Sequence, residues 1–187
     1  METATSLSSG DKATLLGLAR RTIEYYLTHQ EEPAAQTLGI PIGSALQSKR
    51  AAFVTLTRST RLRGCIGDVL PCQPLYRSVM SNAVNAAVND RRFARVSLVE
   101  LSDLHIEISA LTVPKEMDSY RDIRLGVDGI ILQKDKLRAV FLPQVAPEQG
   151  WTLEETLSQL SQKAGLASGQ WRQNATFLTF QAEVFGA

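Results

Sequence analysis

The sequence predicts an α+β protein in which mixed or antiparallel sheets pack against helices. One stretch, 104–110, alternates apolar and polar side chains, which is typical of a strand with one face in water. A second stretch, 129–142, has the pattern of two strands joined by a turn. Elsewhere, apolar residues recur at helical spacing in three segments. Together these patterns favour sheets and helices in one compact fold.

The chain has 187 residues, which suits one domain or two small, closely packed lobes. We expect a flexible polar tail at 1–10 and a single domain over 11–187, with any junction between lobes near 112–128. The N-terminus has no basic segment followed by an apolar one, and no apolar run reaches about 18 residues. We therefore expect a cytoplasmic protein with reduced thiols and no membrane span.

Charge and cysteine content exclude several classes of protein. The net charge is +1, whereas general nucleic-acid binders carry a pronounced basic excess. Cys65 and Cys72 are the only cysteines, and their spacing matches neither a disulfide framework nor a zinc site. We predict no metal site, and the sequence identifies no cofactor and no oligomeric state.

The N-terminal half begins with a predicted helix from Asp11 that ends before Glu31, ahead of Pro33. Residues 33–50 are rich in proline and glycine and are expected to form an irregular connection. The stretch 51–57 is β-branched and aromatic, which predicts a strand.

A glycine-rich stretch, 61–68, follows this strand and reads Arg-Leu-Arg-Gly-Cys-Ile-Gly-Asp. Because Gly64 and Gly67 permit backbone geometries that other residues avoid, we expect a loop here. A helix over 75–89 should come next, with a face of small residues that allows close packing.

The C-terminal half contains the alternating strand 104–110 and a charged loop over 114–125. The hairpin strands 129–133 and 137–142, a helix over 153–164 and a final strand over 176–185 follow. Thr152 and Glu155 form a capping box at the start of that helix, and Gly165 suits its end.

The order of elements suggests a duplicated strand–helix–strand unit. The first copy combines 51–57, the glycine–cysteine loop, 75–89 and 104–111; the second combines 137–142, the loop 142–145, 153–164 and 176–185. This alignment places Cys65 and Gln144 at equivalent points.

Cys65 is the first candidate for chemistry. A thiolate near arginine is a potential nucleophile, and Arg61 and Arg63 are close in sequence. Alternatively, Cys65 fills a tight buried space, as cysteines often do, or contacts a metal or cofactor. His105 is a weak candidate base, which Glu107 could orient, although a solvated strand face explains both residues as well.

Several neighbours of Cys65 are candidates for substrate binding. The amides around Gly64, Ile66 and Gly67 could accept an anion, or the glycines could serve turn geometry alone. Arg63 could hold an anionic group or form a salt bridge. Gln144 could contact a substrate or tie down its own loop.

Four motifs resemble one known family. They are L-R-G-C-I-G at 62–67, N-D-R-R-F at 89–93, E-L-S-D-L at 100–104, and the segment from L-P-Q-V-A at 142–146 to K-A-G-L at 163–166. They resemble the AMME-region candidate protein family, whose prokaryotic members are called AmmeMemoRadiSam system protein A. Ser161 stands where many relatives carry cysteine, and Arg91 replaces a frequent proline.

The resemblance implies an α+β fold with a duplicated strand–helix–strand unit in a larger and a smaller lobe. It also implies genomic association with a Memo-type protein and a radical-SAM protein. We therefore favour an accessory or partner component of unknown activity. The alternative is an enzyme whose cleft is built on the Leu-Arg-Gly-Cys-Ile-Gly loop and uses Cys65 on an anionic substrate.

Overall fold

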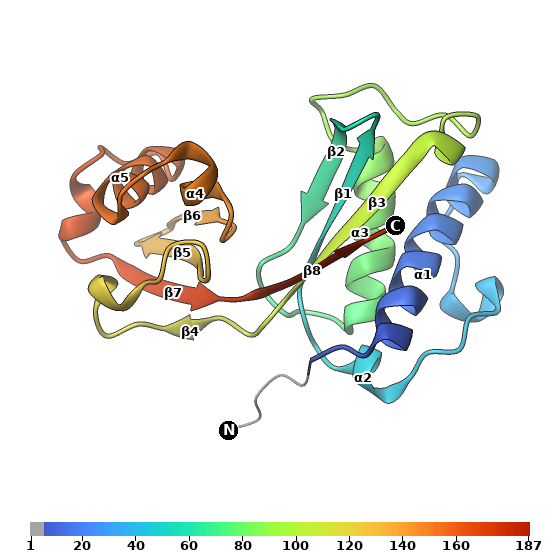
Figure 1. The fold of residues 1–187 in the computed structure, drawn as a ribbon, viewed down its shortest axis with the longest axis horizontal. Helices are drawn as coiled ribbons and strands as arrows, with labels where there is room; N and C mark the ends of the chain where they lie inside the picture. Colours follow the sequence, from blue (N-terminus) through green and yellow to red (C-terminus); the bar gives the residue numbers. More distant parts are fainter. Residues whose placement is uncertain (1–5) are drawn as a thin grey trace. The chain divides into compact units, whose positions relative to one another are not determined.

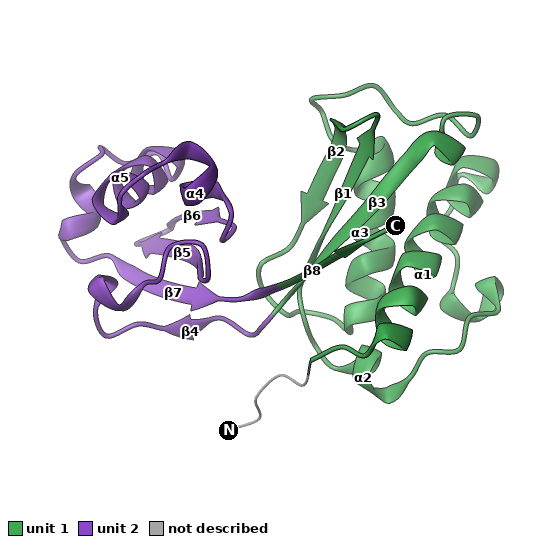
Figure 2. Ribbon diagram, viewed as in Figure 1, with its two compact units in different colours: residues 1–111, 183–187 green, residues 112–182 purple. Residues whose placement is uncertain are grey.

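The computed structural model describes residues 6–187 and has two compact units. Unit 1 extends to Leu111 and also contains Glu183–Ala187, whereas unit 2 spans Thr112–Ala182 (Figures 1 and 2). The chain therefore leaves unit 1 after its third strand and returns to it with its last strand. Helices and antiparallel strands occur in both units, which confirms the predicted α+β class.

Unit 1 contains α1 (Ser9–His29), α2 (Ser44–Gln47), β1 (Ala52–Arg58), β2 (Arg61–Gly67), α3 (Leu75–Val88), β3 (Leu104–Leu111) and most of β8 (Ala182–Gly186). Unit 2 contains β4 (Lys115–Glu116), β5 (Gly129–Lys134), β6 (Leu137–Phe141), α4 (Val145–Gln149), α5 (Leu153–Lys163) and β7 (Thr176–Phe180). Short 3-10 helices lie at Ala35–Leu38, Leu101–Asp103, Tyr120–Asp122 and Gln170–Arg172.

Each unit repeats one topology. The strand order is β2-β1-β3-β8 in unit 1 and β4-β7-β5-β6 in unit 2. In both, a hairpin (β1–β2 or β5–β6) is followed by a helix and then by a strand that pairs with the first strand of the hairpin. The repeated unit is therefore hairpin–helix–strand.

The predicted alignment of the two copies is wrong by one strand. It matched 51–57 with 137–142, whereas the topology matches β1 with β5 and β2 with β6. Cys65 lies within β2, and Gln144 lies after the end of β6, so the two are not at equivalent points. The error arose because Arg61–Gly67 is a strand and not the predicted loop.

The glycines of β2 serve close packing and not a turn. Neither Gly64 nor Gly67 has a positive φ. A Cβ atom at Gly64 would collide with the carbonyl oxygen of Ala86 in α3, and one at Gly67 would collide with the ring of Phe53. Glycine is therefore required here because backbone and ring approach too closely for any side chain.

The predicted final strand, 176–185, is divided between two sheets. β7 pairs with β5 in unit 2, whereas β8 pairs with β3 in unit 1. Gln181 separates the two strands, and its N–H donates to Thr112 Oγ1 at 2.9 Å. The alternation of the sequence continues across this point, so it does not reveal the change of sheet.

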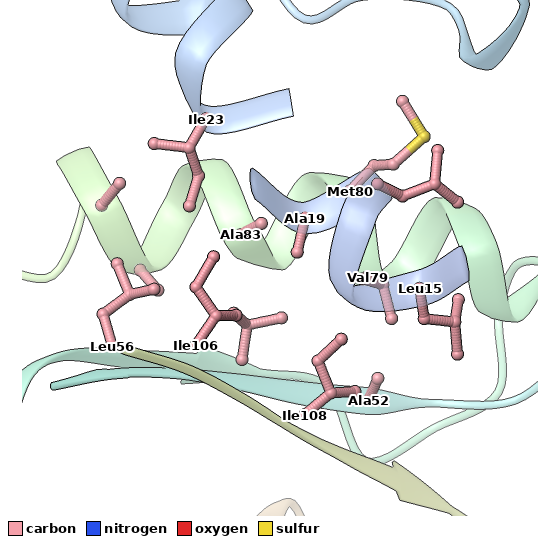
Figure 3. Close-up of a cluster of buried hydrophobic side chains, with 14 of the residues drawn as sticks. Leu15, Ala19, Ile23, Ala52, Leu56, Val79, Met80, Ala83, Ile106 and Ile108 are labelled. Atoms are coloured by element: carbon pink, nitrogen blue, oxygen red, sulfur yellow. The ribbon is translucent and has the colours of Figure 1, made fainter. Parts of the chain in front are cut away.

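The core of unit 1 lies between the sheet and two helices. Figure 3 shows side chains from α1, α3 and the strands meeting in this layer, among them Ile23, Ala83 and Ile106. Ala83, Ala86 and Ala87 are buried, so the small face predicted for α3 packs against the sheet. In unit 2, α5 contributes Leu157 and Leu160 to a second core. The predicted capping box at Thr152 and Glu155 begins α5.

A partly buried ion pair fixes the returning strand β8 in unit 1. The guanidinium of Arg50 donates to Glu183 at 3.1 Å and to the carbonyl oxygens of Ala110 and Leu111. The same carboxylate accepts the N–H of Leu7 at 3.1 Å. Burial acts to raise the pKa of Glu183, but these donors outweigh it and lower the pKa. The pair thus joins three segments that are distant in sequence.

Ser161 offers a test of core packing in unit 2. Its hydroxyl is buried in α5 and has no hydrogen-bond partner among the described residues. Because an unsatisfied buried hydroxyl costs free energy, Ser161→Ala should raise the free energy of unfolding by about 1 kcal/mol in urea titrations. Ser158→Ala is the matched control on the same helix.

The control should destabilise the protein, because the Ser158 hydroxyl donates to the Glu154 carbonyl and accepts the N–H of Trp171. A Ser161→Ala variant that unfolds at a lower urea concentration than the wild type would contradict the prediction.

Candidate functional site

Cys65 lies on the face of the unit 1 sheet that is opposite to the helices. It pairs with Thr55 in β1, and Thr55 pairs with Glu107 in β3. Val54 and Leu56, on either side of Thr55, are buried in the core. Because side chains alternate along a strand, Cys65, Thr55 and Glu107 form a row across three strands on the other face. We call these three residues the thiol row.

The thiol of Cys65 contacts the hydroxyl of Thr55. The Cys65 N–H and carbonyl point away from β1, since they bond to Asp90 and Arg92. Cys65 and Thr55 therefore form a non-hydrogen-bonded pair of the antiparallel ladder, in which side chains approach most closely. Thr55 Oγ1 donates to Cys65 Sγ at 3.3 Å. The sulfur is partly buried and not in a disulfide.

Asp90 and Arg92 hold the backbone of Cys65 from the open edge of the sheet. The buried Asp90 carboxylate accepts the Cys65 N–H at 2.9 Å and the Arg92 guanidinium at 2.7 Å. Arg92 Nη2 donates to the Cys65 carbonyl at 3.2 Å. The bond from Arg92 outweighs burial and, with the Cys65 N–H, holds the pKa of Asp90 far below its ordinary value. We call this arrangement the Asp90 clamp; it satisfies the polar groups of an edge strand.

Arg63 is engaged by Glu100. The pairing of β1 with β2 shifts at this point, so that Arg63 has no partner in β1. Its guanidinium forms a two-point ion pair with Glu100, at 2.6 and 3.1 Å, and also donates to the Ala94 carbonyl at 2.8 Å. The hydrogen bond from Arg63 lowers the pKa of Glu100 against the opposing effect of burial. A role for Arg63 in holding an anion remains a prediction.

The amides predicted to bind an anion face β1. Gly64 is opposite Leu56 and Ile66 is opposite Val54. Because the Cys65 amide points outward, the amides of its two neighbours point inward to the ladder. In this conformation neither amide is available to an anion. Gly67, at the end of β2, lies beneath the Phe53 ring.

His105 is on the same face as Cys65 but beyond hydrogen-bond reach. It pairs with Thr57, one row away from the thiol row, and β1 lies between its strand and β2. Two strand spacings separate backbones by about 10 Å. Its ring lies close over Gly186 of β8. Gln144 is exposed at the start of α4 and belongs to unit 2, whereas Cys65 belongs to unit 1.

Sequence reasoning did not identify Thr55, Ser78 or Asn82. Asn82 donates to the Ala52 carbonyl and to Asp68, and Ser78 accepts the Ala52 N–H. Both polar side chains are buried on the small face of α3, where they satisfy the start of β1. Asparagine within a helix was the signal for this contact. Thr55 gives no signal, because threonine is common in strands.

Residues 6–187 contain neither a cluster of metal ligands nor a membrane-spanning helix. No three His, Cys, Asp or Glu side chains in this range lie close enough together to hold a metal ion. No helix in the same range is both long and apolar enough to cross a membrane.

Comparison with known proteins identifies one family. The AMMECR1 family model matches residues 16–185. A Methanothermobacter thermautotrophicus protein is 38% identical, covering 96% of this chain and 95% of its own length. Protein PF1979 of Pyrococcus furiosus is 40% identical, and the match covers 91% of this chain and 85% of that protein. The crystal structure of uncharacterized protein PH0010 from Pyrococcus horikoshii has a TM-score of 0.81 at 36% identity and covers 92% of this chain and 89% of its own.

The Asp90 clamp should make stability dependent on pH. Because the pKa of Asp90 is depressed in the folded protein, its contribution is complete above about pH 4 and is lost as the pH falls through the folded value. We expect Asp90→Asn to lower the free energy of unfolding by about 2 kcal/mol at pH 7. The gap between variant and wild type should narrow below about pH 4, as urea titrations at several pH values can measure.

Asp103→Asn is the control for this experiment. Asp103 also pairs with an arginine, Arg58, at 2.8 Å, but about half of each side chain is exposed to solvent. An exposed pair contributes less than about 1 kcal/mol. If Asp90→Asn and Asp103→Asn lower the free energy of unfolding equally, the Asp90 clamp has no special role in stability.

Proposed function

Because this chain belongs to the AMMECR1 family, we propose that it is an accessory protein that binds the Memo-type and radical-SAM proteins implied by the family resemblance. In this proposal it works in the cytoplasm and does not itself catalyse a reaction. The thiol row and the sheet face around it form the contact surface.

The arginines beside Cys65 are already paired with carboxylates, which supports this proposal. A site for an anionic substrate needs donors that are free to meet the developing charge. The guanidinium of Arg63 is paired with Glu100, and that of Arg92 is paired with Asp90. The two cations nearest the thiol row therefore fix β2 in place, which favours a rigid binding surface over a catalytic cleft.

The sheet face itself has features of a recognition surface. Its strands are fixed by the Asp90 clamp and by the ladder, so little conformational entropy remains to be lost on binding. Glu107 contributes a carboxylate that forms no ion pair within residues 6–187. A basic side chain of a partner protein can pair with it.

One contact favours a second candidate function, an enzyme that uses Cys65 as a nucleophile on an anionic substrate. The Thr55 hydroxyl donates to the sulfur at 3.3 Å, and a donor at this position stabilises negative charge there. The thiolate is the nucleophilic form of cysteine. Here Thr55 positions and stabilises the reacting sulfur.

Binding measurements with purified partners test the first function. Isothermal titration of the full chain with each partner from the same organism should show that Cys65→Ser changes affinity by less than about twofold. Thr55→Arg should weaken binding at least about tenfold, because a large cation is added to the contact surface. Thr37→Arg is the matched control, since Thr37 is exposed on another part of unit 1. Unchanged affinity in Thr55→Arg would refute this contact surface.

Alkylation of Cys65 tests the second function. In a Cys72→Ser background, iodoacetamide should label Cys65 in the folded protein several-fold faster than in the additional Thr55→Val variant, which lacks the donor to sulfur. Mass spectrometry of tryptic peptides gives the rates. Labelling only after denaturation, or equal rates in the two variants, would remove the support for a reactive thiol.

A further inference from the structure

One end of unit 1 exposes two adjacent aliphatic side chains. Val99 is 88% exposed and Leu98 is 49% exposed. They lie in a tight turn that is closed by a hydrogen bond from the Glu100 N–H to the Ser97 carbonyl at 3.1 Å. Adjacent exposed apolar side chains are a candidate for an interaction surface when further features accompany them.

The turn belongs to a loop that is fixed to the rest of unit 1. Figure 1 shows this loop, between α3 and β3, at the same end of unit 1 as the β1–β2 turn and the C-terminal end of α1. Contacts from Arg92 to the Cys65 carbonyl and from Arg63 to the Ala94 carbonyl hold it along β2. Arg95 Nη2 donates to Gln30 at the end of α1, at 3.2 Å. The turn therefore has a defined position.

Arginines without a carboxylate partner lie in the same loop and at the β1–β2 turn. Residues 91–99 include no carboxylate. Arg61 and Arg91 are exposed and form no ion pair among the described residues, and the contact of Arg95 is with a neutral amide. Leu98 and Val99 together with Arg61, Arg91 and Arg95 are called here the arginine–aliphatic surface. It combines three positive charges with an apolar tip at one end of unit 1.

We propose that the arginine–aliphatic surface binds the headgroup region of an anionic lipid bilayer. In this mode Leu98 and Val99 enter the boundary between headgroups and acyl chains, and the arginines contact lipid phosphates. A tip that projects into solvent suits a bilayer better than a protein partner, which would need a matching pocket. Aliphatic side chains have no corresponding role on a nucleic-acid backbone.

The expected association is weak, reversible and sensitive to salt. Each arginine near an anionic surface strengthens binding about fivefold, and this attraction is screened as the ionic strength rises. Two aliphatic side chains add apolar burial but cannot anchor the protein irreversibly. The proposal does not depend on the accessory function, because it uses none of the residues of the thiol row.

Vesicle flotation with the full chain tests the proposal. The probes are vesicles of phosphatidylcholine alone and vesicles that contain about 30 mol% phosphatidylserine, each in low and high salt. We expect binding only to the anionic vesicles, with loss at high salt. Val99→Asp should weaken binding about tenfold or more, and the double variant Arg91→Glu/Arg95→Glu should do the same.

Val127→Asp and Arg138→Glu are the matched controls. Both side chains are exposed in unit 2, so these variants repeat the chemical changes elsewhere and should bind like the wild type. Circular dichroism should confirm that all variants fold, since every altered side chain lies at the surface.

Two outcomes would overturn the proposal. The first is the absence of selective binding to anionic vesicles at low salt. The second is equal binding by Val99→Asp and wild type. If the first outcome is accompanied by loss of partner binding in Val99→Asp, the surface is assigned to a protein partner. Failure of the accessory function alone leaves vesicle binding unchanged, so the two proposals fail independently.

Discussion

The buried carboxylate of Asp90 is the contact on which unit 1 depends most. It accepts the N–H of Cys65 and holds Arg92, which in turn donates to the Cys65 carbonyl. With β2 fixed in this way, Gly64 lies against the backbone of α3, and the thiol of Cys65 lies beside Thr55. The loop that begins at Arg91 also takes its course along β2 from these contacts. One carboxylate thus joins β2 to the loop that follows α3.

In unit 2, a related contact gives a backbone carbonyl of the edge strand β6 a hydrogen-bond donor. The repeated topology matches β6 with β2 and α5 with α3. Lys163, at the end of α5, donates to the Val140 carbonyl in β6 at 2.8 Å, and its ammonium lies 5.0 Å from the centre of the Phe141 ring. Burial lowers the pKa of this ammonium. In both units a basic side chain near the C-terminal end of a helix donates to a carbonyl of the edge strand, which blunts its tendency to pair with another chain.

Four arginines in β2 and the loop that follows α3 form two groups. Arg63 and Arg92 are paired with carboxylates and stabilise β2, whereas Arg61 and Arg91 are exposed without an acidic partner in residues 6–187. The charge of the first pair is therefore neutralised beside the thiol, whereas that of the second pair is free to meet an anionic partner. This difference is the reason that a surface for binding is better supported at both places than a catalytic site for anions.

The sequence by itself determined the fold class, the family and most helices and strands, because helical spacing, capping residues and alternation are local patterns. It did not determine that Gly64 lies in a strand, because glycine is required both for turns and for close packing. Only the tertiary structure decided that Cys65 lies in a strand, how the two copies of the repeat align, and which arginines pair with a carboxylate. These depend on contacts between residues that are distant along the chain, such as Arg63 with Glu100, which no local pattern records.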